Sequence, residues 1–425
     1  MSSLAPANAH PFVSSEKLPA SELNEFVPKL SRGVPAFPVY YMRGGTSTGI
    51  VLWYKHVPEE KAPKEELIRA IMGVPAAGEH RGNKQTTGLG RGAPTSNKVF
   101  IVSRHSSGEA DIASTLAQLA ADKAAIDWSV NCGNMSAALP IYALDTGLVK
   151  PVVGRTVVRI FNTNTGVTTD ASVHTPDGTE FIPADTEIPG VLGRFPGVDL
   201  TLRHPVGAKT GKLLPTGRPS DQICGVTVSC VDVAVPMVIL RAEELGKTGF
   251  ESIDELARDA RLKERMREIW VAAGLRMGLR RKGGALMSAN DLAHSETVPK
   301  VCLISSSTDG DAHIGARYFT PQAPHSSLAV TGGCCLAVAC LIPGTVAHSL
   351  ARGLESIGEG NCICTVGMRN PAGVLRARIG ATSTSTGLRV TSVAYERSAQ
   401  MFLRGHFPVY HASDALREFA QRWAG

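Results

Sequence analysis

Short apolar runs separated by glycine-rich or polar turns dominate the first half of the chain. These runs predict strands at 38–42, 50–53, 99–102, 156–162, 166–174 and 198–203. Helical periodicity predicts an amphipathic helix over 59–72, with Leu67, Ile68 and Ile71 on one face. A short helix is expected over 116–125, followed by an extended run at 125–130 and a second helical pattern at 135–144.

The second half contains strands and helices in a similar mixture. Strands are expected at 223–231, 233–240, 299–305, 312–318, 374–379 and 388–395. A helical block covers 242–279, in which 253–277 has the periodicity of one or two long amphipathic helices. The apolar run 336–342, which Pro343-Gly344 ends, predicts a short buried helix, and a C-terminal helix is expected at 413–423.

Two corners that contain glycine and cysteine stand where a loop or extended segment meets a helix. The first is Asn131-Cys132-Gly133-Asn134, and the second is Thr331-Gly332-Gly333-Cys334-Cys335. A thiol at a helix start faces the positive end of the helix dipole, and the free amides of the first turn can hold a carboxylate. The corners suggest a weak internal duplication, and two facing helix starts would suit a di- or tricarboxylate. The alternative for Cys132 is a small buried residue at a tight turn.

Two loops rich in glycine and hydroxyl side chains precede apolar strands. Arg43-Gly44-Gly45-Thr46-Ser47-Thr48-Gly49 could bind an anion through amides, hydroxyls and the arginine, or be a plain hairpin turn. The second loop, 86–98, includes Thr95 and Ser96 and ends in Lys98. A lysine that enters an apolar strand is desolvated, which lowers its pKa toward that of a usable base. The alternative is a lysine whose ammonium extends back to solvent at the strand edge.

Composition limits the function classes further. The net charge of +6 over 425 residues is dispersed and has no basic stripe with interleaved aromatics, so we expect no nucleic-acid partner. The charge does suit a small anionic substrate.

The nine cysteines include no CxxC pair, which predicts reduced thiols in a cytoplasmic protein and no metal site. No run reaches ~18 apolar residues, so no membrane span is expected. A homodimer or higher homo-oligomer is left open.

Several segments together resemble motifs of the PrpF family. These segments are Met42-Arg43-Gly44-Gly45-Thr46-Ser47, Thr95-Ser96-Asn97-Lys98-Val99, Asn131-Cys132-Gly133-Asn134, Leu213-Leu214-Pro215-Thr216-Gly217, Val231-Asp232-Val233-Ala234-Val235-Pro236, and Thr331-Gly332-Gly333-Cys334 with Ile342-Pro343-Gly344-Thr345. The resemblance covers roughly residues 38–405. The family includes 2-methylaconitate cis-trans isomerase, 4-oxalomesaconate tautomerase, methylitaconate isomerase and aconitate delta-isomerase.

The resemblance implies a diaminopimelate epimerase-like α+β fold with two pseudo-symmetric β-rich half-barrels, each around a central helix. It implies a reaction without cofactor or metal on a small unsaturated polycarboxylate, with Lys98 and Cys132 handling the moving proton. The expected substrate-binding residues are Arg43, Gly44, Gly45, Thr46, Ser47, Thr95, Ser96, Gly133, Asn134, His325, Thr331, Gly332, Gly333 and Cys334. The expected division is a mobile polar leader at 1–35, half-barrels at 36–205 and 206–405, and a C-terminal helix at 406–425 that packs back on the first half.

The sequence differs from the family pattern at three positions. Thr48 stands where the family usually has lysine, Arg91 stands where it tends to have glycine, and Asn97 is an apparent insertion before Lys98. The insertion leaves open whether Asn97 or Lys98 faces the site. Two other functions also remain open: a two-thiol racemase or epimerase that uses Cys132 and Cys334, and a non-catalytic accessory protein of an aconitase-like enzyme.

Overall fold

The computed structural model describes residues 22–178, 182–202, 205–281, 283–307, 310–360, 362–385 and 387–423. They form two compact units. Unit 1 takes its residues from Met1–Glu187, Gly193–Leu200 and Arg397–Gly425, and unit 2 from Ile188–Leu192 and Thr201–Glu396. The compact units differ from the expected domains, because Arg397–Gly425 belongs to unit 1. The expected boundaries at 36–205, 206–405 and 406–425 remain a prediction. Of the expected leader, residues 1–21 lie outside the described residues.

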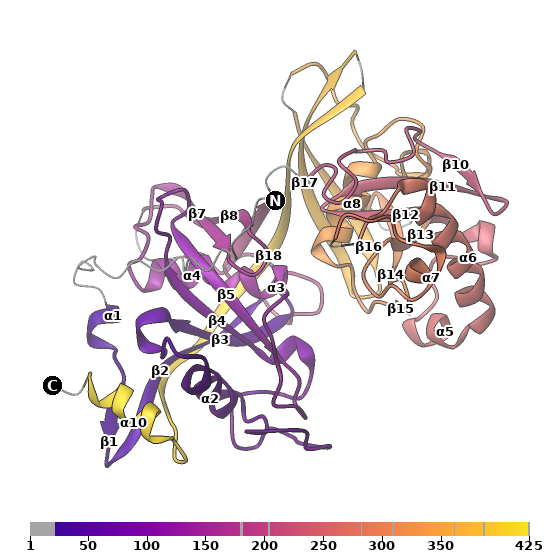
Figure 1. Ribbon diagram of the computed structural model, residues 1–425. Helices are drawn as coiled ribbons and strands as arrows, with labels where there is room; N and C mark the ends of the chain where they lie inside the picture. Colours follow the sequence, from indigo (N-terminus) through magenta and orange to yellow (C-terminus); the bar gives the residue numbers. More distant parts are fainter. Residues whose placement is uncertain are drawn as a thin grey trace, which may run out of the picture. The chain divides into compact units, whose positions relative to one another are not determined.

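Unit 1 is mainly β-structure (Figure 1). Its strands are β1 (Lys29–Ser31), β2 (Val34–Gly44), β3 (Ser47–Trp53), β4 (Lys98–Arg104), β5 (Ile112–Leu119), β6 (Ile126–Asp127), β7 (Gly154–Asn162) and β8 (Val167–Thr175). Its helices are α1 (Glu22–Glu25), α2 (Lys61–Met72), α3 (Gly133–Ser136), α4 (Ala138–Asp145) and α10 (Asp414–Gln421), with 3-10 turns η1 (Tyr54–His56) and η2 (Pro94–Ser96).

Unit 2 has a similar set of elements. Its strands are β10 (Asp221–Ile223), β11 (Val226–Val233), β12 (Val235–Arg241), β13 (Lys300–Ser305), β14 (Ile314–Thr320), β15 (Ala323–Pro324), β16 (Cys362–Asn370) and β17 (Gly373–Thr384). Its helices are η3 (Ala242–Leu245), α5 (Ile253–Arg258), α6 (Ala260–Met277), α7 (Ala289–Ala293), α8 (Val330–Ala339) and α9 (Val346–Leu350). β9 (Gly197–Leu202) and β18 (Gly387–Pro408) contain residues of both units.

The two units share one pattern of strand pairing. In unit 1, β2–β3 is antiparallel, β3–β4 parallel, β4–β5 and β5–β6 antiparallel, β5–β7 parallel and β7–β8 antiparallel. In unit 2, β11–β12, β12–β13, β13–β14, β14–β15, β14–β16 and β16–β17 repeat these relations in the same order. The duplication is therefore present in the topology, and β4 corresponds to β13.

Each sheet has an inner face that packs on a central helix. In unit 1, α4 contacts β2, β7 and β8; in unit 2, α8 contacts β11, β12, β16 and β17. Both helices are apolar on all sides, so they need apolar partners on all sides, which a curved sheet supplies. The predicted α+β class, with two β-rich units each around a central helix, is confirmed.

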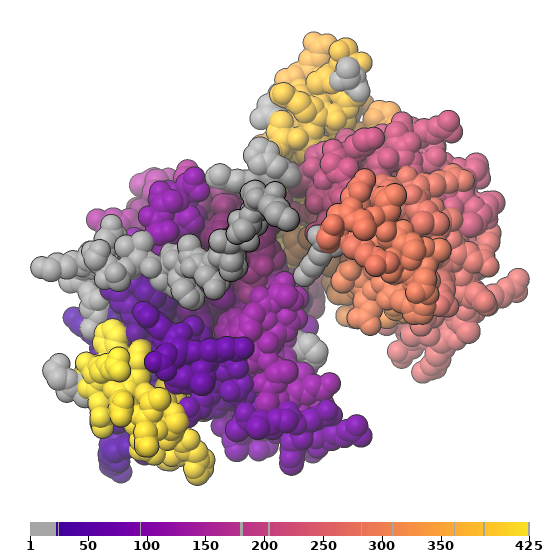
Figure 2. Space-filling view, in the orientation of Figure 1, coloured from indigo at the N-terminus to yellow at the C-terminus, as the bar shows by residue number. Residues whose placement is uncertain are grey.

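The outer face of each sheet is covered by amphipathic helices. In unit 1 these are α2 and α10, and in unit 2 they are chiefly α5 and α6. Figure 2 shows the C-terminal segment in yellow against the indigo part of unit 1, in agreement with the contacts of α10 with α2, β1 and β2. Among the described residues, none of the helices has both the length and the apolar character needed to cross a membrane.

The helix expected over 116–125 is wrong, because residues 112–119 form β5. Leu116 packs in the inner-face cluster and Ala117 in the outer-face cluster, so both faces of this strand are buried. A strand buried on both faces lacks the alternation that identifies strands, and leucine and alanine favour helix locally. Pairing of β5 with β4 and β7, distant in sequence, decides its conformation.

Candidate active site

Cys132 is the residue that begins the inner-face helix α3. It is the N-cap of α3, and its Sγ accepts a hydrogen bond from the Met135 amide at 3.5 Å. The Ser47 hydroxyl lies 3.8 Å from the same sulfur. The Cys132 amide is itself held by the Asn131 side chain at 2.7 Å. The half-buried thiol is therefore fixed at the helix start, as the sequence predicted, and it also packs against the inner-face core.

The turn between β2 and β3 lies directly against the start of α3. A Cβ at Gly44 would stand 2.5 Å from the Asn134 carbonyl oxygen, and one at Gly45 would stand 2.4 Å from Asn134 Oδ1, so only glycine permits this approach. Asn134 Nδ2 donates to Thr46 Oγ1 at 3.3 Å, and its Oδ1 accepts from Arg397 Nε at 2.7 Å. The structure thus brings together these expected site residues: Gly44, Gly45, Thr46, Ser47, Cys132, Gly133 and Asn134.

Lys98 is buried beside this corner. It is the first residue of β4, is 6% exposed, and shares the inner face with Phe100 and Val102. Its Nζ donates to Gln118 Oε1 on β5. Burial lowers the pKa of Lys98, and Coulombic attraction to Cys132 offsets part of that shift. The alternative of a solvent-directed lysine does not describe this buried side chain.

Asn97 points to the outer face and leaves the inner face to Lys98. The Asn97 side chain is 0% exposed; it accepts from Gln85 Nε2 at 2.8 Å and donates to the Gly92 carbonyl at 3.3 Å. Nearby, the Arg91 guanidinium stacks 4.9 Å from the Tyr41 ring centroid. Asn97 and Arg91 therefore belong to the outer-face packing of the second glycine-rich loop.

Gln85→Ala is expected to lower the free energy of unfolding by about 2 kcal/mol, since removal of one partner leaves buried polar groups unpaired. Gln85 has a left-handed φ of 56° and is held by bonds to Met72 O, Asn97 Oδ1 and the Gly92 amide. Urea unfolding measures the change, with the exposed neighbour substitution Lys84→Ala as control. Equal midpoints for the two variants would contradict the structural role of Gln85.

Arg43 is not brought onto the Cys132 face. It pairs with Thr48 on the outer face of the hairpin, whereas the Gly44–Ser47 pair faces α3. Arg43 Nη1 donates to the Gly45 carbonyl at 2.8 Å and the Ser398 carbonyl at 3.1 Å, and its guanidinium stacks 4.5 Å from the Phe195 ring centroid. Burial lowers the pKa of Arg43 to about 10, so it stays charged at neutral pH. It fixes the back of the 44–47 turn.

Two expected residues lie in the 3-10 turn before Lys98. Thr95 is exposed and Ser96 is half-buried, and both belong to η2. Within the described part of the chain, neither side chain makes a hydrogen bond to Lys98 or Cys132. These two residues adjoin the site through the backbone only.

The second corner differs from the first, because α8 already begins at Val330. Gly332 and Gly333 therefore lie inside the helix, where an added Cβ would stand 2.3 Å from the Tyr318 ring and 2.6 Å from the Tyr395 ring. Thr331 is half-buried in the first turn. The glycines of this corner serve close helix–sheet packing.

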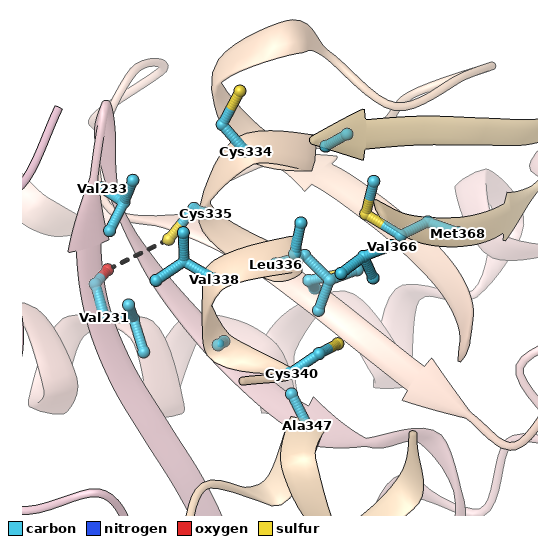
Figure 3. Close-up of a cluster of buried hydrophobic side chains, with 14 of the residues drawn as sticks. Val231, Val233, Cys334, Cys335, Leu336, Val338, Cys340, Ala347, Val366 and Met368 are labelled. Atoms are coloured by element: carbon cyan, nitrogen blue, oxygen red, sulfur yellow. Dashed lines mark hydrogen bonds between the residues drawn. The ribbon is translucent and has the colours of Figure 1, made fainter. Parts of the chain in front are cut away.

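The cysteines of α8 are core residues. Cys334 is 0% exposed and packs in the inner-face cluster of unit 2. Figure 3 shows its sulfur directed away from that of Cys335, which donates to the Val231 carbonyl at 3.4 Å. Burial raises the pKa of Cys335 and of Cys340. Of the thiols in the two corners, the part-exposed Cys132 is the one available for chemistry.

His325 lies just before α8. Its Nδ1 is 2.8 Å from the Ser327 carbonyl, and burial lowers its pKa. Its ring makes an edge contact with Tyr318 at 5.8 Å between centroids. The expected residue is therefore fixed on the inner face of unit 2.

Sequence reasoning missed Gln118, which holds Lys98, and Arg397, which holds Asn134. Gln118 was missed because its strand was predicted as a helix; the cross-strand pair Lys98–Gln118 would have identified it. No local signal marks Arg397.

Within the described residues, no group of three or more His, Cys, Asp or Glu side chains could hold a metal ion.

Comparison with known proteins agrees with the family motifs found in the sequence. Residues 35–410 match the family described as PrpF protein. The chain is 37% identical over 339 residues to "Putative isomerase YbhH" of Escherichia coli (strain K12), covering 80% of this chain and 89% of that protein. It is 37% identical over 319 residues to "4-oxalomesaconate tautomerase" of Pseudomonas putida, covering 75% of this chain and 83% of that protein.

A solved structure shares the fold. The crystal structure of methylitaconate-delta-isomerase superimposes with a TM-score of 0.74 at 28% identity, covering 88% of this chain and 95% of that one. The family match spans both units and includes the Lys98 and Cys132 positions. The chain belongs to the PrpF family.

Proposed function

We propose that this protein is a cofactor-independent isomerase that shifts a proton and a double bond in a small unsaturated di- or tricarboxylate. The observation that carries the proposal is the buried Lys98 on the same inner face as Ser47, whose hydroxyl lies 3.8 Å from the Cys132 sulfur at a helix start. The relatives named as 4-oxalomesaconate tautomerase and 3-methylitaconate isomerase support the substrate class.

In the proposed reaction, the neutral Lys98 amine removes a proton from an allylic carbon of the substrate. The electron pair left behind spreads over the double bond to a carboxylate, giving a dienolate. The Cys132 thiol then donates a proton at the far end of the allylic system, and the double bond moves by one position. Proton transfer between Lys98 and Cys132, directly or through solvent, restores the starting state.

The corner supplies the groups that such a reaction needs. Free amides at the start of α3 and the Thr46 and Ser47 hydroxyls can stabilise the dienolate and hold a carboxylate. Arg43 contributes indirectly, by holding the Gly45 carbonyl. In unit 1, the remaining proposed substrate-binding residues are Gly44, Gly45, Thr95, Ser96, Gly133 and Asn134. In unit 2, they are His325 and Thr331, with Gly332 and Gly333 through their amides; the core position of Cys334 does not support a binding role for its thiol.

Proton NMR in deuterium oxide tests the proposal. Purified protein is incubated separately with cis-aconitate, 2-methylaconitate, itaconate and oxalomesaconate. We expect one of these acids to change its double-bond position and to take up deuterium at an allylic carbon. If no acid of the panel is converted or labelled, the isomerase proposal fails. Inversion of an amino-acid centre in a separate incubation would then favour the racemase over a non-catalytic role.

We also propose a cytoplasmic location. Among the described residues, the cysteines form no disulfide, and Cys224 is exposed. A reducing compartment keeps such thiols free.

A further inference from the structure

Unit 2 contains a lysine at the position that Lys98 occupies in unit 1. Lys300 is the first residue of β13, as Lys98 is the first residue of β4, and these strands correspond in the duplicated topology. Lys300 shares its face with Cys302 and Ile304, which pack in the inner-face cluster around α8. Both lysines therefore lie on inner faces.

The surroundings of the two lysines differ in one respect. Lys98 donates to Gln118, whereas Lys300 Nζ has no hydrogen bond or ion pair among the residues that the structure describes. Burial lowers the pKa of Lys300 to about 8, so most of it is still protonated at pH 7. A half-buried ammonium without a counter-charge favours an anion beside it.

A second polar group next to Lys300 also lacks a partner. Tyr318 on β14 is 1% exposed, and its hydroxyl is buried without a hydrogen bond in the described structure. Tyr318 pairs with Cys302, two residues along β13 from Lys300, so both side chains face inward. His325 lies on the other side of Tyr318, and its pKa is lowered by burial and by the charge of Lys300. The three side chains thus form one row across neighbouring segments, which we call the Lys300 row.

The Lys300 row lies at the start of α8. An added Cβ at Gly332 would stand 2.8 Å from Tyr318 Cζ, so the hydroxyl end of the ring reaches the first helical turn. Among the described residues, no side chain caps α8, and the first backbone hydrogen bond of the helix runs from the Gly333 amide to the Ala329 carbonyl at 2.8 Å. The amides of Val330, Thr331 and Gly332 are therefore free for an acceptor.

We propose that Lys300 is the cationic anchor of a carboxylate-binding site in unit 2, in which the Tyr318 hydroxyl and the first turn of α8 supply further hydrogen bonds. The inference rests on the proposed function only for the choice of a carboxylate as ligand. Lys300 and Tyr318 have binding roles in this unit 2 site, and no proton-transfer step is assigned to them.

The test uses tricarballylate, a saturated tricarboxylate that cannot undergo the double-bond shift. Its binding to the full-length protein is measured by calorimetry at pH 7. Lys300→Met should weaken binding roughly tenfold or more, because it removes a charge-assisted hydrogen bond. Lys300→Arg should recover part of the affinity, and Tyr318→Phe should weaken binding with the ring retained. Lys263→Met, an exposed lysine on α6, is the matched control and should bind as wild type.

The outcomes separate this inference from the proposed function. Wild-type affinity in Lys300→Met overturns the inference even if the protein is an active isomerase. Lys300-dependent binding in a protein that converts none of the acids supports the inference and removes the proposed reaction. If Lys300→Met does not fold, as judged by circular dichroism, Tyr318→Phe and Lys300→Arg decide; unchanged affinity in both overturns the inference.

Discussion

Lys98→Met is expected to lower kcat by roughly 10²- to 10⁴-fold, the contribution of a positioned general base. Methionine keeps the length and apolar volume of the lysine stem, so the inner-face packing around Phe100 is retained. The structural reason for the large effect is that Lys98 is a buried amine on the inner face of unit 1. Turnover is measured by NMR on whichever acid the wild type converts.

The exposed Lys123→Met is the control for Lys98→Met and should retain wild-type turnover. Circular dichroism and thermal unfolding check that both variants are folded. If Lys98→Met keeps more than about a tenth of the wild-type rate, Lys98 is not the base.

The pH dependence gives a second measure of Lys98. The base must be neutral and the donor thiol protonated, so kcat/KM should rise with pH as the amine is deprotonated and fall again once the thiol ionises. Because burial lowers the pKa of Lys98 below 10.5, the rising limb should lie below the pH expected for a free lysine. Since Lys98 and Cys132 interact, the observed limb describes the two groups together. The residual activity of Lys98→Met should lack this limb.

Cys132→Ala is expected to cause a loss of similar size, roughly 10²- to 10⁴-fold in kcat, because it removes the proton donor. Alanine also removes the sulfur that caps α3, so a small loss of stability is expected as well, about 1 kcal/mol. Cys132→Ser separates the two effects. A serine hydroxyl can cap the helix but is a far weaker acid than a thiol, so stability should return while turnover does not.

The exposed Cys224→Ser serves as the thiol control and should leave turnover unchanged. Deuterium exchange then assigns the roles. If Lys98 removes the proton and Cys132 returns one, Cys132→Ala should still exchange the substrate's allylic proton with solvent while forming little product. Lys98→Met should do neither. Wild-type turnover in Cys132→Ser would exclude a thiol-specific step.

The local parts of the site could be predicted from the sequence. Gly44, Gly45 and Cys132 lie where spacing and residue type placed them, because a tight turn and a helix start are each specified by a few consecutive residues. The apolar stretch after Lys98 likewise predicted that this lysine enters a buried strand.

Long-range pairing decided the rest. β5 has helix-favouring residues and two buried faces, so only its pairing with β4 and β7 makes it a strand and brings Gln118 to Lys98. Successive side chains of β2 point to opposite faces, so Arg43 lies on the outer face of the β2–β3 hairpin, although it adjoins the site in sequence.

By itself, the sequence determined the family motifs and the helix start at Cys132, and it predicted that an amine and a thiol act together. The tertiary structure decided which side chains share a face, and it showed Lys300 to be the counterpart of Lys98. The physical reason is that a turn or a cap depends on neighbours in the chain, whereas register and facing depend on strands paired across dozens of residues.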